Sequence, residues 1–208
     1  MTKPILYGAD YSVYVRIARM ALEEKGIDYE LVPLDIFASE GIPAWYLEHH
    51  PFGRIPAFEH DGFRLFETSA IARYVDEAFD GPALQPTDPR SRARMNQIIG
   101  MLDAYGYRSM VWDVAVERLE KAEPDESLIA SGLRQAETVL KVLTSLKAQG
   151  AWLLGNQLTL ADLHAAAIVG YFVKVSEGQK LLSSFAEIQA WWNRIAARKA
   201  IETTQKTD

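Results

Sequence analysis

The spacing of apolar residues changes near residue 80, and this change predicts two domains. Before it, residues 5–7, 29–34, 55–58 and 63–66 are strand-like, whereas stretches around 15–25 and 70–78 repeat apolar positions with helical spacing. A short helix is expected near Trp45, and Asp61-Gly62 between the last two strand-like runs is a hairpin signal. This order, strand-helix-strand and then strand-strand-helix, predicts an α/β domain over residues 1–80.

Strand signals vanish after a linker that holds three prolines and one glycine in the ten residues 80–89. Asp88 and Pro89 are typical of the cap and first residue of a new helix. Helical patterns then run through about 90–120, 125–148, 160–174 and 184–198, with breaks expected at Pro124, Gly150 and Gly178. The sequence therefore predicts an all-helical domain over residues 88–208.

Composition and charge narrow the class of protein. Hydrophobic residues make up 49% and charged residues 24% of the 208, as in ordinary globular proteins. The net charge is −6 with no basic stripe, which argues against a nucleic-acid partner. No apolar run approaches the roughly 20 residues that a membrane span requires, and the N-terminus lacks the apolar core of a signal peptide. We therefore expect a cytoplasmic protein without a membrane partner.

The chain contains no cysteine, which excludes disulfides, thiolate metal sites and a cysteine nucleophile. His49 and His50 are adjacent and precede Pro51, so we expect them at an exposed helix end. Neighbouring residues are poorly placed to chelate one ion. No metal is assigned.

Four segments together resemble the glutathione S-transferase family, in its order and at its spacing over nearly the whole chain. They are residues 6–26, 50–58, 65–71 and 154–162. The second, His-Pro-Phe-Gly-Arg-Ile-Pro-Ala-Phe, lacks the familiar asparagine at its start. The resemblance, to serine-type members of the bacterial phi, theta and zeta kind, implies a thioredoxin-like α/β domain followed by an all-α domain. It also implies a transferase that conjugates its co-substrate glutathione to a hydrophobic electrophile.

Glu67 and Thr68 lie directly before a predicted helix. Unpaired N–H groups and a partial positive charge at a helix N-terminus attract a carboxylate. The Thr68 hydroxyl would add a donor, and Glu67 would hold an ammonium group. The alternative is that Thr68 only caps the helix. Within the resemblance, both residues map onto the site for the γ-glutamyl end of glutathione.

Proline inside the strand-like run 55–58 argues against an ordinary central strand. The resemblance implies a cis bond at Pro56, which would turn the backbone N–H and C=O of Ile55 toward an extended peptide ligand. Arg54 precedes this pair, and its guanidinium suits the glycyl carboxylate of glutathione. The alternative for Arg54 is a solvated surface side chain.

Ser12 is our candidate for activating the glutathione thiol, whose unperturbed pKa of about 8.5 leaves it mostly protonated at pH 7. Its hydroxyl lies just before the first predicted helix and would donate to the sulfur, helped by the helix N-terminus. The alternative is that Ser12 only caps that helix, and we expect the hydroxyl to perform one role or the other. Tyr7 and Tyr11 are rival donors, and Tyr11 is also a candidate neighbour of the sulfur or the electrophile.

The second substrate is expected between the domains, where aromatic and Met residues of the first long helix would line its site. These residues are Tyr105, Tyr107, Met110 and Trp112. The alternative is that they belong to the core.

Phe52 resembles the aromatic residue that the family inserts into a partner subunit, which implies a homodimer. The alternative is that Phe52 is buried within its own chain. Tyr14 stands where isomerase-type relatives carry cysteine, which argues against the maleylacetoacetate isomerase and thiol-transferase branches.

Two other functions fit the same residues: a non-catalytic glutathione-binding protein, and a glutathione-dependent dehalogenase or isomerase. Thr159 and Asp162 form a helix-start pattern that we interpret as a folding element. We expect Asp162→Ala to lower the free energy of unfolding by about 0.5–2 kcal/mol. A role in detoxification follows from the resemblance alone.

Overall fold

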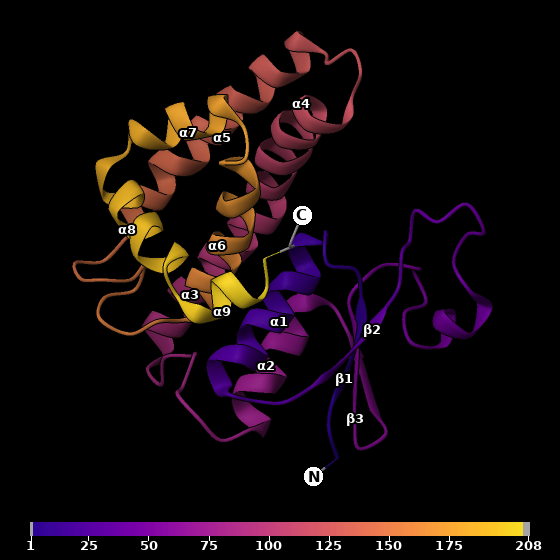
Figure 1. Ribbon diagram of the computed structural model, residues 1–208. Helices are drawn as coiled ribbons and strands as arrows, with labels where there is room; N and C mark the ends of the chain where they lie inside the picture. The colour runs from indigo at the N-terminus through magenta and orange to yellow at the C-terminus, as the bar shows by residue number, and fades with distance from the viewer. Residues whose placement is uncertain (1, 206–208) are drawn as a thin grey trace. The chain divides into compact units, whose positions relative to one another are not determined.

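The computed structural model describes residues 2–205 and divides into two compact units (Figure 1). The first runs to Ala83 and also includes helix α9 (Lys199–Thr203); the second is Leu84–Arg198. The sequence had assigned the C-terminal residues to the helical domain. The structure corrects this, because Ala200 and Ile201 are buried and α9 packs on α1 of the first unit.

The first unit is built on a four-stranded mixed sheet with strand order β2-β1-β3-β4. The strands are β1 (Ile5–Gly8), β2 (Glu30–Pro33), β3 (Ala57–His60) and β4 (Phe63–Phe66). β1 pairs parallel with β2 and antiparallel with β3, and β3 and β4 form the expected hairpin. Leu6 of β1 lies opposite Leu31 and Phe58 and is fully buried with Phe58, so the centre of the sheet is also the centre of this core.

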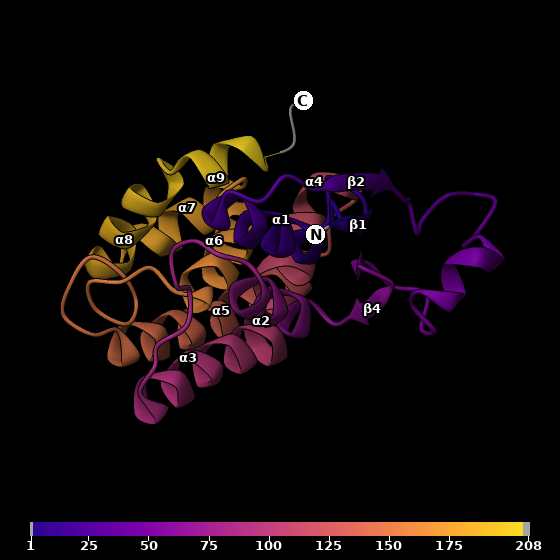
Figure 2. The same cartoon turned by 90° about the horizontal axis from the view of Figure 1, so that it is seen from below.

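Helices α1 (Val13–Lys25) and α2 (Thr68–Ala78) lie on one side of the sheet in both Figure 1 and Figure 2, and they pack on each other. The 3-10 helix η1 (Ala44–Glu48) lies in the segment between β2 and β3. Gly26 ends α1 with a φ of 69°, a left-handed conformation that favours glycine. The predicted order of elements in this half is confirmed.

The second unit is all helical. Its elements are α3 (Pro89–Met101), the π-helix η2 (Leu102–Val116), α4 (Glu117–Glu120), α5 (Glu126–Leu146), α6 (Leu160–Phe172), α7 (Ser176–Ser183) and α8 (Ala186–Ala196). Gly178, the expected break, instead lies inside α7. A Cβ atom there would collide with the carbonyl oxygen of Phe172, so the glycine permits a close packing contact. None of the helices in residues 2–205 combines the length and apolarity needed to cross a membrane.

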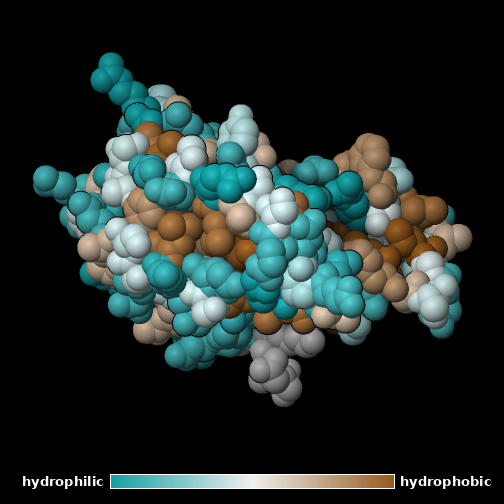
Figure 3. Space-filling view, turned by 90° about the horizontal axis from the view of Figure 1, so that it is seen from above, coloured by the Kyte–Doolittle hydropathy of each residue, from teal (hydrophilic) through white to brown (hydrophobic). Residues whose placement is uncertain are grey.

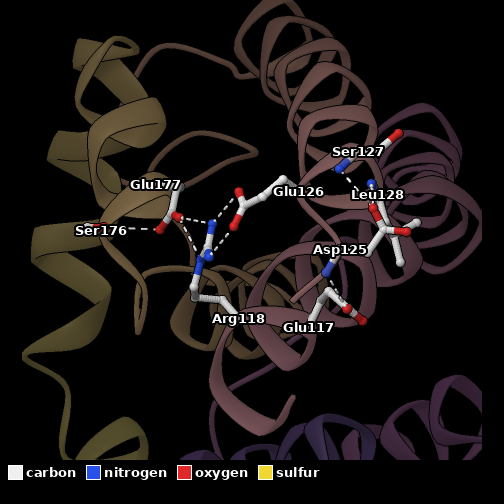
Figure 4. Close-up of polar contacts among 8 residues, drawn as sticks. All are labelled: Glu117, Arg118, Asp125, Glu126, Ser127, Leu128, Ser176 and Glu177. Atoms are coloured by element: carbon white, nitrogen blue, oxygen red, sulfur yellow. Dashed lines mark hydrogen bonds and ion pairs between the residues drawn. The ribbon is translucent and has the colours of Figure 1, made fainter. Parts of the chain in front are cut away.

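An arginine joins three helices of this unit (Figure 4). Arg118 of α4 donates to both carboxylate oxygens of Glu126 at 2.7 and 2.9 Å, and its Nε donates to Glu177 of α7 at 2.8 Å. The neighbouring Glu117 accepts from the backbone N–H of Asp125, and Asp125 in turn caps the first turn of α5. These contacts fix the turn between α4 and α5 and tie it to the start of α7.

The centre of the second unit is α6, whose first turn depends on the fully buried carboxylate of Asp162. Its Oδ2 accepts from the N–H and hydroxyl of Thr159, both at 2.9 Å. Its Oδ1 accepts from the N–H of Leu153 at 2.8 Å and from Nε1 of Trp191 at 2.9 Å. Burial raises the pKa of Asp162, and the hydrogen bonds from these donors act in the opposite direction. The sequence predicted the helix start but neither distant partner.

We expect Asp162→Ala to cost about 3–5 kcal/mol of unfolding free energy, because it leaves four buried donors without their acceptor. This exceeds the value expected of a helix cap alone. The matched control is Asp125→Ala, which removes an exposed cap of α5 and should cost about 1 kcal/mol. Chemical denaturation of both variants measures the difference, and equal losses would show that Asp162 acts only as a cap.

Candidate functional site

Ser12 caps the N-terminus of α1, and its Oγ accepts the backbone N–H of Val15 at 3.3 Å. The side chain is half-buried, and its own N–H donates to the carbonyl of Ala9 at 3.1 Å, which closes the turn before the helix. A hydroxyl has one proton to donate and two lone pairs to accept with. Accepting from Val15 therefore leaves the Ser12 proton to donate elsewhere. The expectation that the hydroxyl must choose one role was wrong on chemical grounds.

The two tyrosines that rival Ser12 lie in different settings. The Tyr11 hydroxyl donates to Oδ1 of Asp35 at 2.7 Å, so its proton is already engaged. Burial and this hydrogen bond raise the pKa of Tyr11 far above its ordinary value, and the same bond lowers the pKa of Asp35. Tyr7 is buried within β1, which raises its pKa, and its ring lies 4.6 Å from that of His49. Neither tyrosine has its hydroxyl at the N-cap of a helix, as Ser12 does.

The start of α2 lacks a side-chain cap. Its N-cap residue is Glu67, whose carbonyl accepts the N–H groups of Ala70 and Ile71 at 2.9 and 3.0 Å. The N–H groups of Thr68 and Ser69 precede these two, and such groups have no partner within a helix. Thr68 is the buried first residue of the helix, so the alternative in which it caps α2 is wrong. The amide groups of Thr68 and Ser69 and the N-terminus of α2 are therefore suited to bind an anion.

Glu67 has an uncommon backbone conformation, with φ of 72° and ψ of 111°. Side-chain-bearing residues seldom adopt a positive φ, and it costs free energy that the surrounding structure must supply. The carboxylate itself is exposed. An exposed acid kept in a costly conformation beside free amide groups is typical of a binding site.

The segment before β3 places three further candidates. The Ile55-Pro56 bond is cis, as expected, and both residues are buried. Arg54 is exposed, and its carbonyl accepts the hydroxyl of Tyr46 at 2.6 Å, which anchors the segment to η1. The structure therefore holds the backbone of Arg54 and leaves its side chain exposed.

His50 was interpreted as an exposed helix end, and this was wrong: its side chain is buried, and its ring lies 4.9 Å from that of Phe66. Burial lowers the pKa of His50; the charge of Glu67 acts to raise it and the charge of Arg54 to lower it. Two of the predicted site residues therefore act electrostatically on one imidazole. The sequence contains one local signal for this position, since His50 stands where the familiar motif carries asparagine.

Phe52 is 73% exposed, which excludes the alternative of a buried intrachain side chain. Phe37, Trp45 and Leu47 in the preceding segment are also exposed. Figure 3 shows apolar surface on the side of the molecule where Figure 1 places η1. Contiguous exposed apolar surface of this kind is typical of interaction sites.

The residues of the second unit that the sequence suggests for the electrophile site differ in burial. Met110 is fully buried and belongs to the core, whereas Tyr105 is exposed. Tyr107 and Trp112 are half-buried on the same π-helix. Within residues 2–205, no group of three or more His, Asp or Glu side chains is arranged to hold a metal ion.

Two family models match the chain: the glutathione S-transferase N-terminal domain over residues 6–83 and the C-terminal domain over residues 101–199. Glutathione S-transferase F13 of Arabidopsis thaliana is 27% identical over 94% of this chain and 91% of its own. A solved glutathione S-transferase III in its apo form is 30% identical, with a TM-score of 0.84 over 98% of this chain and 95% of that one. Poplar glutathione transferase F1 is 27% identical, with a TM-score of 0.86 over 98% of this chain and 97% of that one.

Proposed function

Because the chain belongs to the glutathione S-transferase family, we propose that Ser12 ionises the glutathione thiol and that Glu67 and Thr68 bind the γ-glutamyl end. The chain is a glutathione transferase with glutathione as its co-substrate. The observation that supports the assignment is the hydrogen bond that the Ser12 hydroxyl accepts from Val15, since an accepting hydroxyl still has its own proton to donate to the sulfur.

The chemical task is to keep the bound thiol ionised near neutral pH. A hydrogen bond to a charged group contributes about 1.5–3 kcal/mol, which corresponds to a fall of one to two units in thiol pKa. The N-terminus of α1 adds positive potential in the same place. The thiolate then attacks an electrophilic carbon, a sulfur–carbon bond forms, and the leaving group departs with its electron pair.

The γ-glutamyl end of glutathione carries a carboxylate and an ammonium group, and the start of α2 offers a complement to each. The amide groups of Thr68 and Ser69 and the Thr68 hydroxyl suit the carboxylate, whereas the Glu67 carboxylate suits the ammonium. Ile55 and Pro56 would pair with the peptide backbone, and Arg54 would bind the glycyl carboxylate. These residues belong to one unit, so this half of the site does not depend on the second.

The helical unit would supply the surface for a hydrophobic electrophile. Tyr105, Tyr107 and Trp112 have exposed or half-buried aromatic rings that suit an apolar substrate, while the burial of Met110 favours a core role. Aryl or alkyl halides fit this chemistry, and dehalogenation would use the same thiolate. A cytoplasmic location and a role in detoxification are part of the same proposal.

A homodimer is also part of the proposal. The 73% exposure of Phe52 on a short loop, together with the other exposed apolar side chains of residues 37–47, supports insertion of Phe52 into a partner subunit.

Ser12→Ala should raise the pKa of the bound glutathione thiol by about one to two units and lower the rate at neutral pH by about 10- to 100-fold. Tyr11→Phe should leave the thiol pKa nearly unchanged, because the Tyr11 proton is held by Asp35. Thiolate absorbance against pH, with each variant saturated in glutathione, measures both.

Ser12→Ala also removes a helix cap, so the control is Asp88→Ala, which removes the cap of α3 and the acceptor of the Ser91 N–H. The control should lose about 1 kcal/mol of stability and leave the thiol pKa unchanged. A normal thiol pKa in Ser12→Ala together with a raised one in Tyr11→Phe would reverse the assignment.

Glu67→Ala should weaken glutathione binding by about 1.5–3 kcal/mol, the range of a charged hydrogen bond. Glu67→Gly is the matched control for the backbone, because glycine accepts the φ of 72° without penalty. It should lose as much affinity as Glu67→Ala while keeping or gaining stability. Calorimetry that finds wild-type affinity in both variants would remove Glu67 from the site.

Phe52→Ser should shift the protein from dimer toward monomer at micromolar concentration, because it deletes the exposed aromatic side chain proposed to enter the partner. Phe63→Ser provides the control, since Phe63 is an exposed phenylalanine of β4 in the same unit. Sedimentation velocity measures all three proteins. A wild type that is already monomeric would contradict the dimer.

A further inference from the structure

Two arginines of α1 bind the backbone of the C-terminal segment. Arg16 donates from Nη2 to the carbonyl of Ile201 at 3.1 Å, and Arg19 donates from Nη2 to the carbonyl of Thr203 at 3.4 Å. Both Figure 1 and Figure 2 draw α9 alongside α1. Burial, with a smaller contribution from the charge of Arg19, lowers the pKa of Arg16 to about 10. The carbonyl of Ile201 therefore replaces water around the Arg16 guanidinium, which is largely removed from solvent.

Arg19 also reaches the loop that carries Ser12. Its Nη1 lies 3.7 Å from Oδ1 of Asp10, and its Nε donates to the hydroxyl of Tyr29 at 3.1 Å. One guanidinium thus contacts the residue two positions before Ser12, the approach to β2, and the C-terminal helix. Its side chain is only 13% exposed, so its orientation is restricted by these partners.

The loop of residues 8–12 is otherwise held on its β2 side. The carbonyl of Gly8 accepts the N–H of Leu34 at 3.1 Å, and the hydroxyl of Tyr11 bonds to Asp35. Ser12 is tied to α1 as its cap, and Asp10 is tied to the body of the helix through Arg19. Since Ser12 is the cap of α1, a contact between this loop and the body of that helix fixes the angle at which the chain enters it.

We propose that Arg19 is a positioning residue for the Ser12 hydroxyl: braced by α9 and Tyr29, it holds Asp10 and so orients the loop that presents Ser12 to the glutathione thiol. This inference rests on the proposed role of Ser12. It gives the C-terminal segment a function in the first unit, since α9 supplies one of the acceptors that orient the guanidinium.

Arg19→Gln should raise the pKa of the bound thiol and lower kcat below neutral pH by about two- to fivefold, the factor that one exposed ion pair supplies. KM for glutathione should stay within about twofold, because the γ-glutamyl contacts lie at the start of α2. Arg19→Lys should recover part of kcat by restoring the charge opposite Asp10. A purely structural role would lower the melting temperature and leave the thiol pKa and the split between kcat and KM unaltered.

Asp10→Asn tests the same contact from the exposed loop and does not disturb the buried arginine. It should reproduce the thiol pKa and kcat of Arg19→Gln, and the double variant should show no larger effect than either single one. Raising the ionic strength from about 0.05 to 0.5 M should lower kcat in the wild type and leave Asp10→Asn nearly unaffected, because salt screens the pair. Asp28→Asn is the matched control, since it breaks the exposed ion pair with Lys3 in the same unit.

The Ser12→Ala background separates this inference from the proposal beneath it. If Ser12→Ala raises the thiol pKa, and Asp10→Asn raises it in the wild type but adds nothing in the Ser12→Ala background, both stand. If Ser12→Ala raises the thiol pKa while Asp10→Asn and Arg19→Gln match the wild type, the positioning role is overturned and Ser12 remains the donor. If Ser12→Ala leaves the thiol pKa unchanged, the proposed donor fails and Arg19 has no hydroxyl to position.

Discussion

The amide groups that a helix leaves unpaired in its first turn determine much of this structure. Each must find an acceptor, from the chain or from a ligand. Asp88 meets this need for α3 and Asp125 for α5, while Asp162 combines it with two partners from distant segments. At α2 no side chain caps the first turn, and the amide groups there suit the carboxylate of glutathione. The same requirement therefore stabilises the helical unit and underlies the binding site that we propose in the other.

α1 combines the two solutions in a single residue. The oxygen of Ser12 accepts from Val15 and stabilises the helix, and its proton is available to the thiol. A tyrosine donor would need a partner-free hydroxyl, and the bond from Tyr11 to Asp35 removes that freedom. The serine can serve both purposes because a hydroxyl separates its donor from its acceptor function. In the proposed mechanism, the stability of α1 and the acidity of the bound thiol are thus linked through one side chain.

The C-terminal segment belongs to the unit that binds glutathione, although the helical unit separates the two in sequence. Two half-buried arginines make this association specific, because each guanidinium requires acceptors in fixed directions. Arg16 and Arg19 find them at the carbonyls of Ile201 and Thr203. A hydrophobic contact alone would allow α9 to slide, whereas these hydrogen bonds define its register on α1.

Local signals in the sequence determined the order of the elements, the helix starts at Ser12 and Asp88, and the segment that contains Pro56, since capping and hairpin preferences act over three or four residues. The tertiary structure decided which hydroxyl is free, where His50 lies, and which unit holds α9. These outcomes depend on contacts between distant positions: Tyr11 and Asp35 are 24 residues apart, and Arg16 and Thr204 are 188 apart. No local pattern encodes such pairs, because burial and hydrogen-bond partners are assigned only when the whole chain has packed.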